Sequence, residues 1–197
     1  DDTETHNNLG NTFKQQGKLE EAEVSYIQAI VLKPDFADAH SNLGNTLKEL
    51  TRLDEAEASF KQAIVLKPNF ANSHSNLGTT LQELVRLEEA EASYMKAIAL
   101  EPDFSLAHHN LGNMLKEQGK LEKAEVSYKQ SIALKPHYAQ AHSNLGNTLR
   151  ELGRLDAAEA SYTQAIALKP DFAEAYSNLG NTLKELGRLD AAFSAYI

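Results

Sequence analysis

Apolar residues recur along the chain with the spacing of amphipathic helices. Within residues 139–153 one face carries residues at i, i+3, i+4 and i+7, namely His142, Leu145, Gly146 and Leu149. A second set with helical spacing follows Gly153 and comprises Ala158, Tyr162, Ala165, Ile166 and Leu168. Glycine is a common helix terminator, and a proline cannot continue a helix. The pattern therefore predicts two helices, separated at Gly153 and ended by Pro170.

This two-helix pattern repeats with a period of 34 residues. The prolines that end the second helix lie at Pro34, Pro68, Pro102, Pro136 and Pro170. The glycine of Asn-Leu-Gly lies at Gly10, Gly44, Gly78, Gly112, Gly146 and Gly180. We divide the chain into repeats 3–36, 37–70, 71–104, 105–138 and 139–172 and a partial repeat 173–197. Positions are numbered 1 to 34 within each repeat, and residues 1–197 are expected to form a single array.

Composition narrows the class of protein. Ala and Leu number 27 each, whereas Val and Ile together number 12, which favours an all-α fold. The net charge of −9 disfavours a nucleic-acid binder, and the absence of cysteine excludes disulfides and Cys–Zn sites. Apolar runs of at most four residues predict no membrane span, and the acidic N-terminus shows no signal peptide. We expect a cytoplasmic protein, although the missing cysteines leave the compartment open.

The repeat resembles the tetratricopeptide repeat (TPR). The matching residues of the second repeat are Leu43, Gly44, Ala56, Phe60, Ala63 and Pro68. The tryptophan usual near the start of the motif is replaced by His6, His40, His74, His108, His142 and Tyr176. The resemblance implies a right-handed superhelical solenoid of stacked antiparallel helix pairs, with the first helices lining a concave groove. It also implies a non-catalytic scaffold for protein–protein interactions.

Asparagines dominate the face of the first helices opposite the apolar set. Of 14 asparagines, 11 occupy positions 6 and 9: Asn8, Asn11, Asn42, Asn45, Asn76, Asn110, Asn113, Asn144, Asn147, Asn178 and Asn181. Asn costs roughly half a kcal/mol against Ala within a helix, so a solvated face would not favour it. Two interpretations remain open. In the first, the amides join neighbouring repeats, or duplication of one repeat simply copied them. In the second, the amides bind a ligand. An amide carries both a donor and an acceptor, so a row of them can hold an extended peptide by its backbone.

The asparagine row is similar to the asparagine ladder in the repeat region of O-linked N-acetylglucosamine transferases, where it holds substrate peptides. A second family use, the carboxylate clamp, needs cations at positions 2, 5 and 6, which are missing here. Positions 12 and 13 carry parallel basic and acidic stripes, and the acidic stripe favours a peptide with some Lys or Arg. In the fourth repeat Leu106 and His109 interrupt the polar pattern, which predicts the most ligand-selective patch there.

No motif indicates an enzyme, a metal site or a cofactor. The histidines at position 4 lie one repeat apart, and no His-Glu-x-x-His or phosphate-binding loop occurs. The expected partner is a protein or peptide in the groove, with no nucleic acid and no membrane. Two alternatives stay open: an array that stacks head to tail through uncapped ends, or the substrate-recruiting arm of a larger enzyme such as a glycosyltransferase. The head-to-tail alternative rests on apolar residues near the C-terminus, including Phe193, Tyr196 and Ile197.

Position 15 predicts strained turns. It is glycine in four repeats but Thr51 and Val85 in the second and third. If this turn needs a left-handed residue, a β-branched side chain there is unfavourable.

Overall fold

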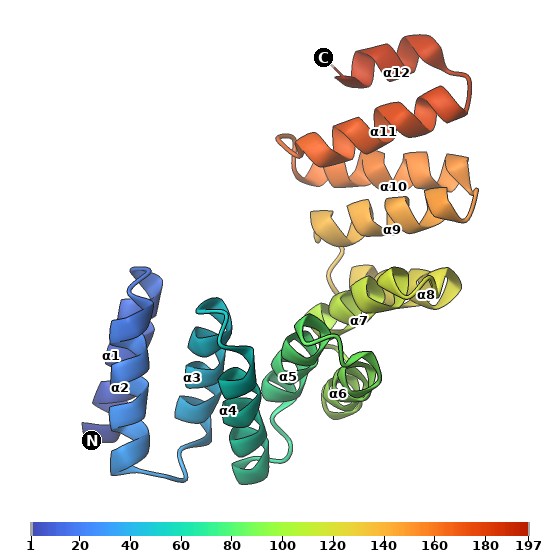
Figure 1. Cartoon of the computed structure of the whole chain (residues 1–197). Coiled ribbons are helices and arrows are strands. Elements are labelled where there is room, and N and C mark those ends of the chain that lie inside the picture. The colour runs from blue at the N-terminus through green and yellow to red at the C-terminus, as the bar shows by residue number, and fades with distance from the viewer. Residues whose placement is uncertain (1, 197) are drawn as a thin grey trace. The chain divides into compact units, whose positions relative to one another are not determined.

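The chain folds into α-helices throughout the part that the structure describes. The computed structural model describes residues 2–196, and within them it contains twelve helices and no strand (Figure 1). The helices are α1 (Asp2–Gln15), α2 (Leu19–Leu32), α3 (Ala37–Glu49), α4 (Leu53–Leu66), α5 (Ala71–Glu83), α6 (Leu87–Leu100), α7 (Ser105–Glu117), α8 (Leu121–Leu134), α9 (Ala139–Glu151), α10 (Leu155–Leu168), α11 (Ala173–Glu185) and α12 (Leu189–Tyr196). None of the helices found there is long and apolar enough to cross a membrane.

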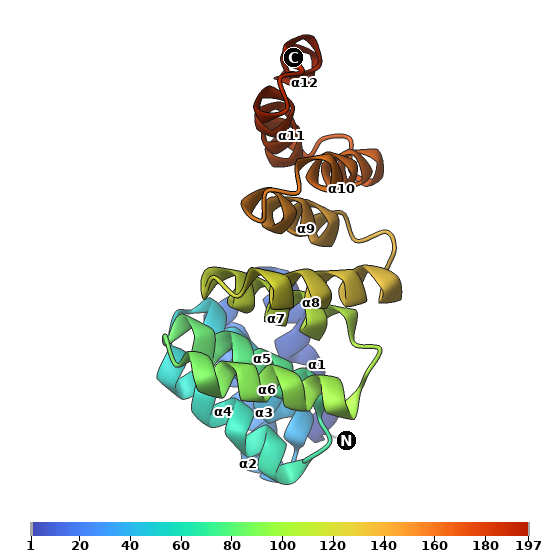
Figure 2. The same ribbon diagram turned by 90° about the vertical axis from the view of Figure 1, so that its right-hand side faces the viewer.

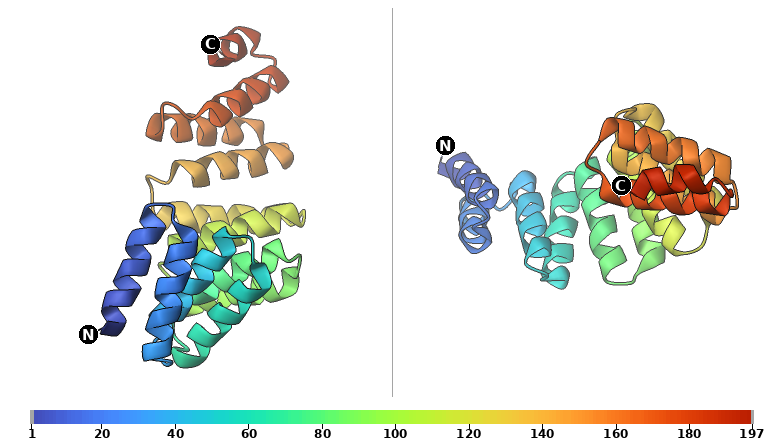
Figure 3. Two further views of the ribbon diagram at one scale, coloured as in Figure 1. Left: turned by 60° about the vertical axis from the view of Figure 1, so that its left-hand side comes forward. Right: turned by 90° about the horizontal axis from the view of Figure 1, so that it is seen from above.

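The helices gather into two compact units, Asp1–Pro102 and Asp103–Ile197. In the first unit α1 to α6 follow one another in chain order (Figure 3), and in the second unit α9 to α12 do the same (Figure 2). Within each unit, neighbouring first helices also contact each other, as α1 does with α3 and α9 with α11. Within the described residues of either unit, the second helices do not contact one another. The first helices therefore lie on the inner side of each unit.

A glycine and an aromatic ring join the two helices of each repeat. A Cβ atom added to Gly146 would lie 2.7 Å from the ring of Tyr162, closer than real carbon atoms approach. Tyr162 is fully buried, and the position-20 residue Ala158 is 0% exposed. The same glycine–aromatic contact occurs at Gly10, Gly44, Gly78 and Gly112. The predicted close approach of the paired helices is thus confirmed, and it depends on the missing glycine side chain.

Arginines before the second helices bind the preceding repeat on its outer side. Arg86 contacts Glu57 at 2.7 Å, and Arg154 contacts Glu125 at 2.7 Å. A hydrogen bond from Lys129 holds the pKa of Glu125 below its usual range, and Arg154 adds to this effect. In the partial repeat Phe193 replaces this glutamate, but the side chains from Phe193 onward, and Ile197, lie outside the described residues. The apolar end surface and head-to-tail association stay predictions.

The predicted left-handed turn is confirmed. Thr51 and Val85 have φ angles of 60° and 61°, close to the 72–74° of the glycines at position 15. A side chain costs roughly 1–2 kcal/mol in this conformation. The Thr51 hydroxyl donates a hydrogen bond to the carbonyl of Leu50 at 2.7 Å, whereas Val85 is 77% exposed. The strain is therefore better compensated at Thr51 than at Val85.

We expect Val85→Gly to raise the free energy of unfolding by about 0.5–1 kcal/mol, and Thr51→Gly by less. Relief of strain exceeds the extra chain entropy that glycine gives the unfolded state. Urea unfolding followed by circular dichroism measures the change. The reverse change, Gly153→Val, serves as the control and should destabilise, because Gly153 has a φ of 73° and open space around it. Equal midpoints for all three variants and the wild type would contradict this account.

Candidate functional site

The asparagines at positions 6 and 9 lie on the inner side of each unit. Nine of the eleven are half-buried, and Asn8 and Asn181 are exposed. We call this row the asparagine ladder and define it by the residues Asn8, Asn11, Asn42, Asn45, Asn76, Asn110, Asn113, Asn144, Asn147, Asn178 and Asn181.

In the second unit each ladder step is built from two asparagines and a tyrosine. The Oδ1 atom of Asn147 accepts a hydrogen bond from Tyr162 Oη at 2.7 Å and from Asn178 Nδ2 at 3.0 Å. Asn113 Oδ1 accepts in the same way from Tyr128 Oη and from Asn144 Nδ2, both at 2.8 Å. Both lone pairs of the Asn113 and Asn147 Oδ1 atoms are therefore occupied, and the bonds link one repeat to the next.

The first unit has the same ladder with substitutions. Asn76 donates to Asn45 at 2.9 Å, whereas Asn42 donates to Asn7 at 3.0 Å. Tyr26 Oη donates to Asn11 at 2.8 Å. Phe60 has no hydroxyl to offer Asn45. In the third repeat Tyr94 Oη lies 3.2 Å from Thr79, which stands at position 9.

The sequence did not reveal Asn7 or the tyrosine hydroxyls as members of this network. A signal for the hydroxyls did exist, because a buried tyrosine usually finds a hydrogen-bond partner. The contacts agree with the interpretation that the amides join neighbouring repeats. However, these contacts engage only one of the two polar atoms of most of the amides.

In most ladder amides one of the two polar atoms, Oδ1 or Nδ2, makes no hydrogen bond among the described residues. Among the described residues, no hydrogen bond engages the Nδ2 atoms of Asn113 and Asn147 or the Oδ1 atom of Asn178. Asn144 Oδ1 accepts from Gln140 at 3.1 Å. The bonded half fixes the orientation of each amide. A step such as Asn147–Asn178 therefore offers one N–H donor and one carbonyl acceptor to the inner face.

His109 does not belong to an exposed patch, which corrects the prediction for the fourth repeat. Its ring is 5% exposed and lies 4.8 Å from the ring of Tyr138. Asn144 Nδ2 approaches His109 Nε2 at 3.1 Å, and burial lowers the pKa of the imidazole. The neutral ring is therefore a buried neighbour of the ladder and contacts Asn144. Leu106, by contrast, is 44% exposed. Only this repeat pairs a position-5 histidine with a tyrosine in place of the following phenylalanine.

The histidines at position 4 have a packing role. His40, His74 and His142 each place Nε2 at 3.0–3.1 Å from the carbonyl of the proline that ends the preceding repeat. Within residues 2–196 no group of three His, Asp or Glu side chains is placed to hold a metal ion.

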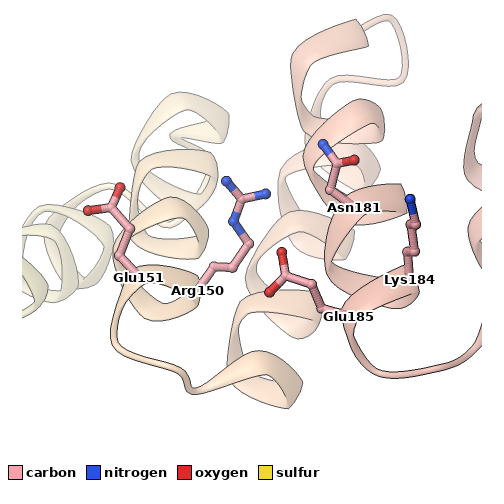
Figure 4. Close-up of a pocket in the computed structure, with 5 residues that line it drawn as sticks. All are labelled: Arg150, Glu151, Asn181, Lys184 and Glu185. Carbon is pink, nitrogen blue, oxygen red and sulfur yellow. The ribbon is translucent and has the colours of Figure 1, made fainter.

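Charged side chains border the ladder and pair across repeats. Lys14 contacts Glu49 at 2.9 Å, and Lys116 contacts Glu151 at 2.8 Å, each a position-12 cation with the position-13 acid of the next repeat. Beside the last ladder step lies a pocket of about 550 Å³ between α9 and α11 (Figure 4). Its lining residues are Arg150, Glu151, Asn181, Lys184 and Glu185.

Family models match the chain from Gly10 to Gly187 without a gap. A model described as TPR repeat matches residues 10–51, 112–149 and 146–187. Models described as tetratricopeptide repeat match residues 93–126, 37–70 and 71–104. The chain belongs to the TPR family. The prediction of an all-α array of antiparallel helix pairs is confirmed.

Solved TPR structures resemble this TPR chain closely. PilF of Pseudomonas aeruginosa has a TM-score of 0.88 at 22% identity, over 98% of this chain and 88% of that chain. PilW, described as a widely conserved type IV pilus biogenesis factor, has a TM-score of 0.89 at 25% identity, over 98% of this chain and 90% of that chain. YrrB, described as a TPR protein with an unusual peptide-binding site, has a TM-score of 0.67 at 25% identity, over 86% of this chain and 88% of that chain. No curated protein sequence matches the chain. The TPR architecture is that of a protein–protein interaction scaffold.

Proposed function

We propose that the TPR chain is a non-catalytic, cytoplasmic scaffold that binds extended peptide segments along the asparagine ladder. It needs no cofactor. The proposal rests on one observation above all: the Asn147–Asn178 step keeps an N–H donor on Asn147 and a carbonyl acceptor on Asn178 after its structural bonds are made.

The free donor and acceptor of one step are complementary to a peptide bond. Asn147 Nδ2 can donate to a peptide carbonyl while Asn178 Oδ1 accepts from a peptide N–H. Because structural bonds already hold these amides, little side-chain entropy is lost when they bind. The likeness to YrrB supports a peptide ligand as well. The two interpretations of the asparagines are therefore compatible, since at Asn147 and Asn178 one half of the amide joins repeats and the other half binds the ligand.

The test compares a ladder variant with a matched control. We expect Asn178→Ala, which removes the free acceptor of the Asn147–Asn178 step, to weaken capture of a degenerate library of 12-residue peptides by about fivefold, the effect of losing one net hydrogen bond. The control replaces two exposed amides of α8 and α10, Gln130→Ala with Gln164→Ala, and should capture peptides like the wild type.

The position-6 residues are the right ones to change, because Tyr162 keeps its bond to Asn147 when Asn178 is removed. Capture by the ladder variant equal to that of the wild type would contradict the proposed function.

A further inference from the structure

The pattern of ion pairs beside the ladder is interrupted at the last repeat. Lys116 pairs with Glu151 across one repeat boundary, so Arg150 would be expected to pair with Glu185 across the next. Among the described residues, however, the side chains of Arg150 and Glu185 make no hydrogen bond and no ion pair. Figure 4 shows the guanidinium of Arg150 extending into the space between α9 and α11.

The unpaired charges of this pocket sum to a positive value. Arg150 and Lys184 each contribute a cation, and neither has an acidic partner within the described part of the chain. Lys116 already neutralises Glu151, so Glu185 is the one acid left to oppose them. The pocket is thus locally cationic, although the chain as a whole carries a net charge of −9.

A carboxylate is the group that fits this arrangement. A guanidinium presents a planar fork of N–H donors that matches the two oxygens of a carboxylate. Arg150 is half-buried at the edge of the inner face, and Asn181 of the ladder lines the same pocket. A peptide held at the Asn147–Asn178 step therefore passes beside the pocket. Glu185 would repel a second acidic group, which favours a single carboxylate over an acidic run.

We propose that this pocket binds an Asp or Glu side chain of the peptide held by the ladder, with Arg150 as its specificity-determining residue. The proposal rests on the proposed function and adds a sequence requirement to a ladder that reads only the backbone. It also revises the expectation of a peptide with some Lys or Arg, because Lys14 and Lys116 neutralise two members of the acidic stripe.

The experiment reads the sequences that the immobilised full chain selects from the degenerate library. The wild type should enrich Asp and Glu at one position by about fivefold, the effect of one partly exposed, bidentate charge pair. Arg150→Gln should remove that enrichment, and Arg150→Glu should replace it with enrichment of Lys and Arg. The control Arg154→Gln alters an arginine that pairs with Glu125 on the outer side and should keep the acidic preference.

Each outcome separates the two proposals. Captured peptides without an acidic position, or an acidic preference that survives Arg150→Gln, would overturn the Arg150 assignment while the proposed function stands. Failure of the wild type to capture any peptide would overturn both. Circular dichroism of each variant confirms folding, which we expect to be unchanged because the Arg150 side chain makes no hydrogen bond or ion pair with a described residue.

Discussion

Replacing Gly146 with alanine is expected to lower the free energy of unfolding by about 1–3 kcal/mol, the usual cost of overpacking a core. The added Cβ atom would lie 2.7, 2.8 and 2.9 Å from three ring atoms of Tyr162. The ring cannot turn away easily, because Tyr162 is fully buried and its hydroxyl is bonded to Asn147. The helices α9 and α10 must therefore separate, and alanine's better helix propensity recovers only part of the loss.

Gly153 provides the matched control for this prediction. It has open space around it and a φ of 73°, so Gly153→Ala should cost about 1 kcal/mol through backbone strain alone. Urea unfolding of both variants measures the difference. A loss at Gly146→Ala no larger than that at Gly153→Ala would show that close helix approach does not limit stability here.

Asn147→Ala is expected to destabilise the chain by about 1–3 kcal/mol, the penalty for leaving a buried donor unsatisfied. It removes the acceptor of both Tyr162 Oη and Asn178 Nδ2. Burial raises the pKa of Tyr162 to about 12, so the hydroxyl stays protonated and cannot avoid the penalty by ionising. Helix propensity does not contribute to this destabilisation, because alanine is a better helix former than asparagine.

The second repeat contains the natural control. Asn45 accepts from Asn76 but faces Phe60, which has no hydroxyl, so Asn45→Ala should cost less than Asn147→Ala. Adding Tyr162→Phe to Asn147→Ala should recover part of the lost stability, because the orphaned hydroxyl is then gone. Thermal unfolding of these variants tests both expectations. Equal losses at Asn45 and Asn147 would mean that the tyrosine bond contributes nothing.

The helices, the tight glycine–aromatic contact and the left-handed turn could be predicted from the sequence because each is local or repeats exactly. Gly146 and Tyr162 recur in equivalent form in every complete repeat, and Thr51 and Val85 are recognisable where glycine is missing. These features need only helical periodicity and backbone sterics. The asparagine row was visible for the same reason.

The details of the site could not be predicted, because they depend on contacts across repeats. The burial of His109 requires Tyr138, which lies 29 residues later and closes over the imidazole. The orientation of the Asn147 amide is set by the Tyr162 hydroxyl rather than by its own helix. Whether Arg150 pairs with Glu185 depends on side-chain conformations that periodicity does not determine.

Recognition of the peptide backbone by the ladder is the central claim, and an ester scan tests it most directly. A peptide recovered from the library is resynthesised with single backbone amides replaced by esters, which removes one N–H donor without changing any side chain. We expect esters opposite the ladder to weaken binding by about tenfold, and alanine substitutions outside the acidic position to change it by about twofold or less. The ester that removes the N–H opposite Asn178 should have no effect on binding to the Asn178→Ala variant. Ester substitutions without effect, together with large losses from side-chain substitutions, would contradict backbone recognition.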